Sequence, residues 1–88
     1  MTEDQIRQVV IDELLNIAPE TDPAAIGPEE DIRDALDIDS MDVLNFVIAL
    51  HGRLHVDIPD IDAPKLLTIA GAVAYLAKKL AASGIAPG

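Results

Sequence analysis

The stretch ALDIDSMDVLNF, residues 35–46, joins an acidic loop to an apolar helical pattern. Asp39 and Ser40 are residue types that favour the N-cap of a helix, and Asp42 follows in the first turn, where the helix dipole favours negative charge. The helical spacing of the apolar residues predicts a helix that begins at residue 39 or 40. Gly52 predicts that the helix frays or ends around that residue, because glycine destabilises a helix interior by about 1 kcal/mol relative to alanine. The predicted buried stripe is Met41, Leu44, Val47, Ile48 and Leu54, broadened by Val43, Phe46 and Leu50.

Three further segments predict helices on either side of this one. Thr2-Glu3-Asp4-Gln5 fits the capping-box pattern and predicts a first helix near residues 3–16. Thr68 is placed to cap a last helix, from about residue 69 to 82. Residues 60–66 predict a short helix between the second and the last, because proline is tolerated in its first turn.

Residues 18–39 hold three prolines, one glycine and many acidic residues, which predicts a long loop. Within it, Asp31 to Leu36 predicts one turn of helix. We therefore predict an all-α fold: a small bundle of three main helices plus one short helix, with the long loop between helices 1 and 2. Residues 1–82 form its single domain, and residues 83–88 form a flexible C-terminal tail. The apolar residues predicted to anchor the loop are Ile26, Ile32, Leu36 and Ile38.

The net charge of the 88-residue chain is −10, and it is unevenly distributed. Residues 1–44 hold 13 Asp and Glu residues against two arginines, whereas residues 45–88 have a balance of +1. An acidic field of this kind repels nucleic acid and anionic membranes and attracts proteins with basic patches. We therefore expect no nucleic-acid partner and no stable membrane insertion, but protein partners that dock through basic patches.

The residue content excludes several other classes of protein. A chain of this length forms one small domain with little room for an enclosed active site. It has no cysteine, which excludes disulfides, thiolate metal sites and a cysteine nucleophile. The acidic start Met1-Thr2-Glu3-Asp4 is unlike a signal peptide, and no apolar run approaches the roughly 20 residues of a membrane span. We expect a cytoplasmic monomer.

The remaining candidates for catalysis or metal binding do not assemble. His51 and His55 are four residues apart, but no glutamate or third histidine is near enough to complete a zinc site. The aspartates around Ser40 miss the EF-hand pattern, because Asp42 stands where that loop requires glycine. A Ser40–His51 dyad is excluded, because about 16 Å of helix separates the two residues. We predict no catalytic residue and no metal.

Ser40 itself is the remaining candidate for chemistry. At a helix N-terminus a serine hydroxyl is exposed, and free backbone N–H groups and the positive end of the dipole favour an attached phosphoryl group. Asp39 and Asp42 oppose a free dianion but oppose a phosphodiester less, because it carries a single charge. Taken alone, the dipeptide favours the simpler alternative that Asp39 and Ser40 only cap the helix.

Three ordered motifs resemble the acyl carrier protein family. Leu36-Asp37-Ile38-Asp39-Ser40-Met41-Asp42 resembles the family's Leu-Gly-x-Asp-Ser-Leu-Asp. Val56-Asp57-Ile58-Pro59-Asp60 is similar to the Ile-x-Ile-Pro-Asp connector after the second helix. Lys65-Leu66-Leu67-Thr68-Ile69, followed by Ala72-Val73, is similar to the Lys-x-x-Thr-Val-x-x-Ala-Val entry to the last helix. The resemblance covers about residues 3–80.

The resemblance implies that Ser40 is esterified with 4′-phosphopantetheine, which a separate Mg²⁺-dependent phosphopantetheinyl transferase takes from coenzyme A. Acyl groups would ride as thioesters on the thiol of this arm to acyl-loading and acyl-processing enzymes, and the chain itself would not be an enzyme. Asp39 would help the transferase recognise the site. The docking surface for partner enzymes would include Asp37, Met41, Asp42 and Asn45. An acyl pocket would be lined by Phe46, Val47, Leu50, Ile61, Leu66 and Ala72, for which an ordinary core is the alternative.

Two departures from the family pattern are informative. Asp37 stands where the family commonly has glycine; if the backbone requires positive φ there, Asp37 is strained, although aspartate tolerates it better than most residues. Housekeeping fatty-acid carriers have a strongly acidic second helix, whereas this one becomes neutral or weakly basic towards its end. This predicts a carrier for a dedicated pathway. The exposed positions that depart are Asn45, His51, Gly52 and Arg53.

Two questions stay open at the level of sequence. The cargo could be a fatty acyl, polyketide, aminoacyl or D-alanyl group, and the Asp-Ser pair favours carriers of fatty-acid, lipid or polyketide biosynthesis. A function from a different class is an unmodified acidic helical interaction module with the same fold, in which Ser40 is only a cap.

Overall fold

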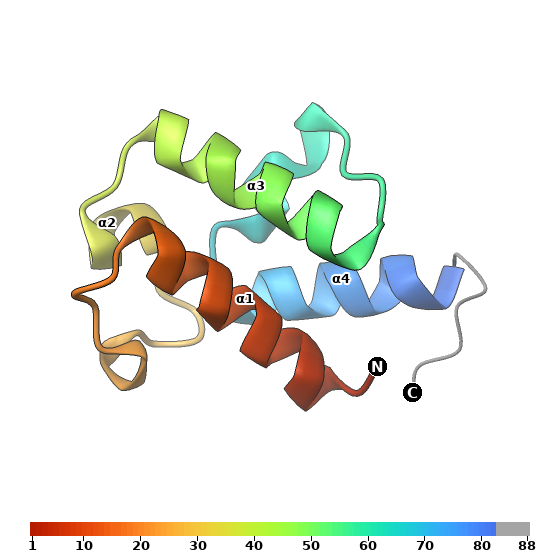
Figure 1. The fold of residues 1–88 in the computed structure, drawn as a ribbon, viewed down its shortest axis with the longest axis horizontal. Coiled ribbons are helices and arrows are strands. Elements are labelled where there is room, and N and C mark those ends of the chain that lie inside the picture. The colour runs from red at the N-terminus through yellow and green to blue at the C-terminus, as the bar shows by residue number, and fades with distance from the viewer. Residues whose placement is uncertain (83–88) are drawn as a thin grey trace.

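Helices make up the whole regular structure of residues 1–82, the part of the chain that the computed structural model describes (Figure 1). The predicted tail, residues 83–88, lies outside the described residues. No described helix is long and apolar enough to cross a membrane. The predicted all-α bundle is confirmed. Its elements are α1 (Glu3–Ile17), the 3₁₀ helix η1 (Pro23–Ala25), α2 (Ile32–Leu36), α3 (Ser40–Leu54), the 3₁₀ helix η2 (Asp60–Leu66) and α4 (Ile69–Ala82).

The predicted helix caps are present. At the start of α1, the Gln5 amide donates to Thr2 Oγ1 at 3.2 Å and the Thr2 amide donates to Gln5 Oε1 at 2.8 Å, which completes the capping box. Thr68 Oγ1 accepts from the Gly71 amide at 2.9 Å before α4. The helix was expected to fray or end around Gly52, and it ends two residues further on, at Leu54. Leu54 is buried, and packing of this last turn outweighs the glycine penalty.

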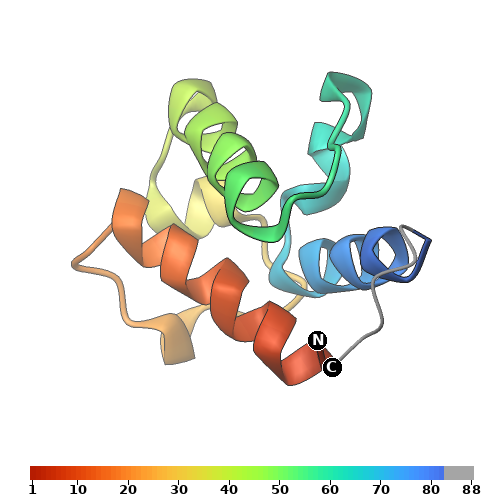
Figure 2. The same cartoon turned by 45° about the vertical axis from the view of Figure 1, so that its right-hand side comes forward.

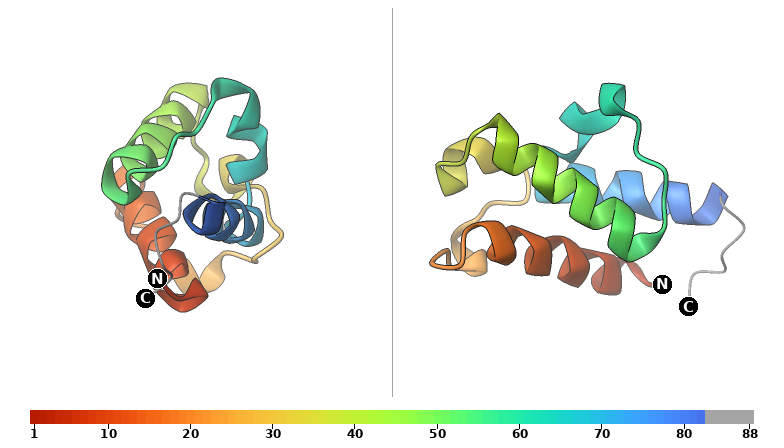
Figure 3. Two further views of the ribbon diagram at one scale, coloured as in Figure 1. Left: turned by 90° about the vertical axis from the view of Figure 1, so that its right-hand side faces the viewer. Right: turned by 45° about the horizontal axis from the view of Figure 1, so that its top comes forward.

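Four elements enclose the core. α1 packs along both α3 and α4, and η2 contacts α3 and α4 on the other side. Figure 2 shows η2 above α4, and the left view of Figure 3 shows α1, α3, η2 and α4 around a common centre. Burying this aliphatic centre supplies most of the favourable free energy of folding. Its largest fully buried side chains are Ile6, Val10, Leu14, Ile32, Phe46, Leu50, Leu66 and Leu76.

The long connection between α1 and α3 is tied to the opposite end of the chain. The Ile32 amide donates to the Leu67 carbonyl at 2.8 Å, and the Ala70 amide donates to the Pro28 carbonyl at 2.9 Å. The predicted anchors pack as expected: Ile32 is fully buried, and Ile26, Leu36 and Ile38 are partly buried against the core. These contacts hold α2, and therefore the start of α3, in a fixed position over the η2–α4 junction.

The predicted buried stripe of α3 is partly wrong. Met41, Leu44 and Ile48 are 62%, 46% and 55% exposed, respectively. α3 turns a different face to α1 and η2, so the three side chains lie on the solvent side of the helix. The buried face consists of Val43, Phe46, Val47, Leu50 and Leu54.

Candidate functional site

Ser40 is the first residue of α3, and its side chain is exposed. The cap of the helix is made by its two neighbours: the Asp42 amide donates to Asp39 Oδ1 at 3.0 Å, and the Asp39 amide donates to Asp42 Oδ2 at 3.4 Å. The Ser40 hydroxyl makes no hydrogen bond to any residue between 1 and 82. Asp39 is therefore the N-cap, and the serine hydroxyl remains available for chemistry.

The backbone around Ser40 offers donors to an anion. The Asp42 amide is used by Asp39 Oδ1, and the Val43 amide donates to the Asp39 carbonyl at 3.1 Å. The amides of Ser40 and Met41 have no partner within the described part of the chain. Free N–H groups at the positive end of a helix dipole favour a phosphate oxygen.

A left-handed turn at Asp37 leads the chain from α2 into α3. Asp37 has φ 52° and ψ 47°, so the position does require positive φ, where aspartate stands in place of the family's usual glycine. Its amide donates to the Arg33 carbonyl, and the Ile38 amide donates to the same oxygen at 3.2 Å. This turn orients the first residues of α3 towards solvent.

A pocket of about 180 Å³ lies directly beside Ser40. Residues of α2, α3 and η2, and the residue after η2, form its wall. Arg33 is the cation that lines it, and its guanidinium pairs with Asp31 at 2.7 Å (Nη2 to Oδ2), which lowers the pKa of the Asp31 carboxyl. No sequence pattern indicated this wall, because it forms only where residues of α2, α3 and η2 meet in the folded chain. The lining residues besides Ser40 are Arg33, Val43, Ala63, Pro64 and Leu67.

The structure brings five of the six predicted acyl-pocket residues together in the core and separates the sixth. Ile61 is 85% exposed and lies outside this core cluster, so its place in a pocket wall remains a prediction. A 3₁₀ helix repeats every three residues, which turns Ala63 and Leu66 inward and leaves Ile61, two residues before Ala63, on the outer face. The five core residues are Phe46, Val47, Leu50, Leu66 and Ala72.

The predicted docking residues lie around the solvent side of the start of α3. Asp37, Met41 and Asn45 are exposed, and Asp42 is partly buried because its carboxylate takes part in the cap. Leu44 and Ile48, which were expected in the core, extend the exposed apolar side of Met41 along the helix.

The two histidines lie at the far end of α3 and belong to its termination. His51 Nδ1 lies 2.6 Å from the Val56 carbonyl oxygen, and His55 caps the helix with φ 55°. Residues 1–82 contain no group of three or more His, Cys, Asp or Glu side chains placed to hold a metal ion.

Comparison with known proteins shows the family to which the chain belongs. The family described as "Phosphopantetheine attachment site" matches residues 4–76, a range that contains Ser40. The chain belongs to this family. A curated relative named "Acyl carrier protein" from Campylobacter curvus (strain 525.92) is 40% identical over 75 residues, which cover 85% of this chain and 91% of that protein. One of the same name from Chlorobium phaeobacteroides (strain DSM 266 / SMG 266 / 2430) is 35% identical over 79 residues, covering 90% of this chain and 100% of that protein.

Membership of the family identifies the prosthetic group of the chain and its role as a carrier. The chain is a phosphopantetheine carrier, its prosthetic group is 4′-phosphopantetheine, and a carrier of this kind acts with partner enzymes. The residues at the start of α3 fit such a group: an exposed, unengaged hydroxyl, two free amides and an adjoining pocket. The chemistry that the group supplies is a terminal thiol on a flexible tether.

Proposed function

We propose that Ser40 is the attachment residue and that the chain is a non-enzymatic acyl carrier for enzymes of fatty-acid, lipid or polyketide biosynthesis. The observation that carries the proposal is the exposed hydroxyl of Ser40, left free because Asp39 supplies the cap of α3. A serine that served only as a helix cap would have its oxygen engaged by a backbone amide.

Each neighbour of Ser40 has a defined task in this proposal. The amides of Ser40 and Met41 stabilise the single charge of the phosphodiester at the start of the helix. Asp39 keeps the helix end formed and presents a carboxylate for recognition by the transferase. Arg33 provides the positive charge in the pocket wall, where it partly offsets the surrounding aspartates.

Partner enzymes dock on the exposed face of α3 beside the attachment residue. Met41, Leu44 and Ile48 supply an apolar strip, and the aspartates at the start of the helix supply the acidic edge. Beyond Asn45 the exposed positions carry little negative charge, so a partner with a basic patch is attracted only to the first half of α3. We therefore infer a dedicated pathway rather than general fatty-acid synthesis. Full activity with housekeeping fatty-acid synthase enzymes would contradict this inference.

The pocket beside Ser40 is the proposed entrance for cargo. Val43, Leu67 and Ala63 give it apolar walls, and the core residues behind it are aliphatic except for Phe46. An acyl chain would be sheltered by separation of α3 from η2, with Val47, Leu50, Leu66 and Ala72 as its deeper contacts. Apolar surface removed from water stabilises such a chain by about 25 cal/mol per Å².

The direct test is intact-mass measurement after incubation with coenzyme A, Mg²⁺ and a phosphopantetheinyl transferase of broad specificity. We expect the mass to rise by one phosphopantetheinyl group in the wild type and to stay unchanged in Ser40→Ala. Ser83→Ala is the matched control, because Ser83 is the only other serine, and it should be modified like the wild type. An unchanged wild-type mass would favour the unmodified interaction module.

A further inference from the structure

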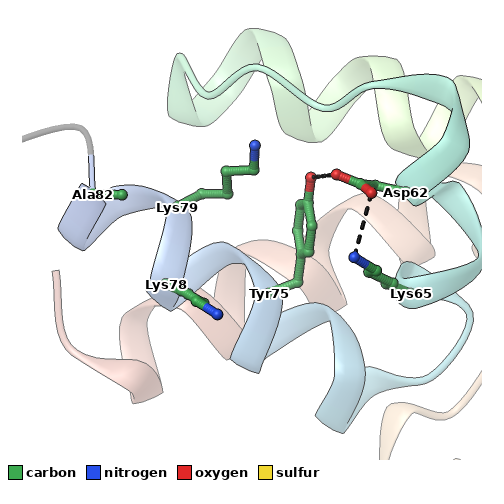
Figure 4. A pocket seen from close by; sticks show the side chains of 6 residues that line it. All are labelled: Asp62, Lys65, Tyr75, Lys78, Lys79 and Ala82. Carbon is green, nitrogen blue, oxygen red and sulfur yellow. Dashed lines mark hydrogen bonds and ion pairs between the residues drawn. The ribbon is translucent and has the colours of Figure 1, made fainter.

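All three lysines of the chain line one pocket between η2 and α4. This lysine pocket has a volume of about 290 Å³ and is drawn in Figure 4. η2 contributes to both of the pockets that flank it: Ala63 and Pro64 line the one at Ser40, and Asp62 and Lys65 line this one. The residues of the lysine pocket are Asp62, Lys65, Tyr75, Lys78, Lys79 and Ala82.

The arginines and the lysines of the chain differ in how their charges are used. All three arginines form an ion pair with an aspartate: Arg7, Arg33 and Arg53. Lys78 and Lys79, in contrast, have no ion pair with any residue between 1 and 82. The ammonium groups of the pocket therefore include two whose charge is not neutralised by a contact. The arginine pairs are Arg7–Asp4 at 3.4 Å, Arg33–Asp31 at 2.7 Å and Arg53–Asp12 at 3.2 Å.

The single carboxylate of the pocket is already occupied. The Tyr75 hydroxyl donates to Asp62 Oδ2 at 2.6 Å, and Lys65 Nζ lies 3.3 Å from Asp62 Oδ1. The hydrogen bond from Tyr75 is the main cause that lowers the pKa of Asp62, so this carboxylate stays ionised. The Lys65 and Lys79 ammonium groups lie 5.9 and 5.6 Å from the centre of the Tyr75 ring, and Figure 4 shows the ring between them. Three cations and one anion leave the pocket positive in a chain of net charge −10.

The charge of the rest of the molecule decides what kind of anion this pocket can receive. Electrostatic fields extend about 8 Å at physiological ionic strength, and the molecule measures only 35 × 25 × 20 Å. A long polyanion such as nucleic acid would reach the acidic residues of the first half and be repelled. A second copy of the chain is disfavoured for the same reason, because each copy carries −10. A short acidic segment can fill the pocket without reaching those residues.

We propose that the lysine pocket is a second docking surface, which receives a short glutamate- or aspartate-rich segment of a partner protein between Lys78 and Lys79 of α4 and Lys65 of η2. This surface is separate from the face of α3 that carries Ser40, and it does not depend on the modification of Ser40. A partner with basic and acidic docking elements would then hold the carrier in one orientation, since each element meets the opposite charge.

Titration with a defined peptide, followed by amide chemical shifts of isotope-labelled full-length protein at low salt, tests the proposal. The probe is a blocked peptide of about six residues that is mostly glutamate, and its control is the same peptide with glutamine, because only the charge differs. We expect the acidic peptide to shift the resonances of Lys65, Tyr75, Lys78 and Lys79, and the glutamine peptide to shift none of them.

Single variants distinguish local docking from general attraction. We expect Lys78→Gln and Lys79→Gln each to weaken binding at least about threefold and the double variant at least about tenfold, whereas Arg7→Gln, which removes an equal charge elsewhere, leaves it unchanged. Thermal unfolding verifies that each variant is folded. No shifts up to millimolar peptide, equal effects of Arg7→Gln, equal binding of an oligonucleotide at the same residues, or peptide-independent dimerisation through them would each overturn the proposal.

Discussion

The two faces of η2 differ in their charge and in the hydrogen-bonding groups that they border. One face borders Ser40, with an unengaged hydroxyl, free amides and aspartates at the start of α3. The other borders α4, where the lysines gather around a carboxylate that is already hydrogen-bonded. One short helix thus separates a site suited to covalent attachment from a site suited to docking. The surroundings of Ser40 have the same sign of charge as the whole chain, whose net charge is −10, whereas the lysine pocket has the opposite sign.

The largest expected effect tests whether the two sites are independent. Reversing the charge of both lysines of α4, Lys78→Glu with Lys79→Glu, should leave the attachment of phosphopantetheine at Ser40 complete, because neither lysine contacts the start of α3. The same variant should lose all binding of the acidic peptide, because the pocket becomes negative. The measurements are intact mass and peptide titration on one preparation. Loss of modification in this variant would contradict the separation of the two faces.

The junction between η2 and α4 is expected to be sensitive to a single added methyl group. A Cβ on Gly71 would lie 2.7 Å from both the Lys65 carbonyl oxygen and Thr68 Oγ1, so Gly71→Ala forces η2 away from α4. We expect a loss of about 1–3 kcal/mol in the free energy of unfolding, measured by denaturant titration.

Gly52→Ala is the matched control for that substitution. Gly52 lies inside α3, and a Cβ added to it would meet no atom within 4 Å. The change should therefore stabilise the protein by about 0.5–1 kcal/mol, since alanine is the better helix former. Destabilisation of the two variants by equal amounts would show that the close contact at Gly71 is unimportant.

Asp39 has two roles, and two substitutions can separate them. Asp39→Ala removes the cap of α3 and should cost about 1 kcal/mol of stability, whereas Asp39→Asn keeps a capping oxygen and should cost only a few tenths. Both remove the charge that the transferase is proposed to recognise, so both should slow the modification of Ser40. Wild-type rates for Asp39→Asn would restrict Asp39 to its structural role.

The smallest effect concerns the pH dependence of the lysine pocket. Burial raises the pKa of Tyr75 to about 12 from its usual 10.0, and the contact with Asp62 adds to this. Because the folded pKa is the higher one, protonated Tyr75 stabilises the fold fully below pH 10, and this contribution is lost as the pH rises through about 12.

Tyrosinate absorbance measures this titration cleanly, because Tyr75 is the only tyrosine and the chain has no tryptophan. Asp62→Asn should lower the pKa of Tyr75 only partly, since burial is the larger cause. Titration of the wild type near its usual value of 10.0 would mean that neither the burial of Tyr75 nor its contact with Asp62 persists in solution.

Local signals made most of the fold predictable from the sequence. The N-cap residues, the proline-rich connection and the helical spacing depend on residues close together in the chain, so the starts of α1, α3 and α4 were predicted correctly. The errors arose where the burial of a residue depends on which other element packs against its helix. The spacing of Met41, Leu44 and Ile48 fits a helix face but does not say which face meets α1.

In the candidate site too, features that depend on neighbouring residues were predicted, and features that depend on packing between distant segments were not. Ser40 and Asp39 were found from a contiguous motif, and the positive φ at Asp37 follows from the glycine usually found there. Arg33, Pro64 and Leu67 come from segments that meet only in the folded chain, so the sequence could not predict the pocket beside Ser40. The lysine pocket was missed for this reason too, because Lys65 and Lys79 lie on different elements.

Fragment-ion mass spectrometry of the modified wild-type protein tests the central claim most directly, because it locates the phosphopantetheinyl group on one residue. The free hydroxyl at the amino end of α3 predicts that the entire adduct resides on Ser40. An adduct on Ser83, on a threonine or on Tyr75, with Ser40 unmodified, would contradict the account.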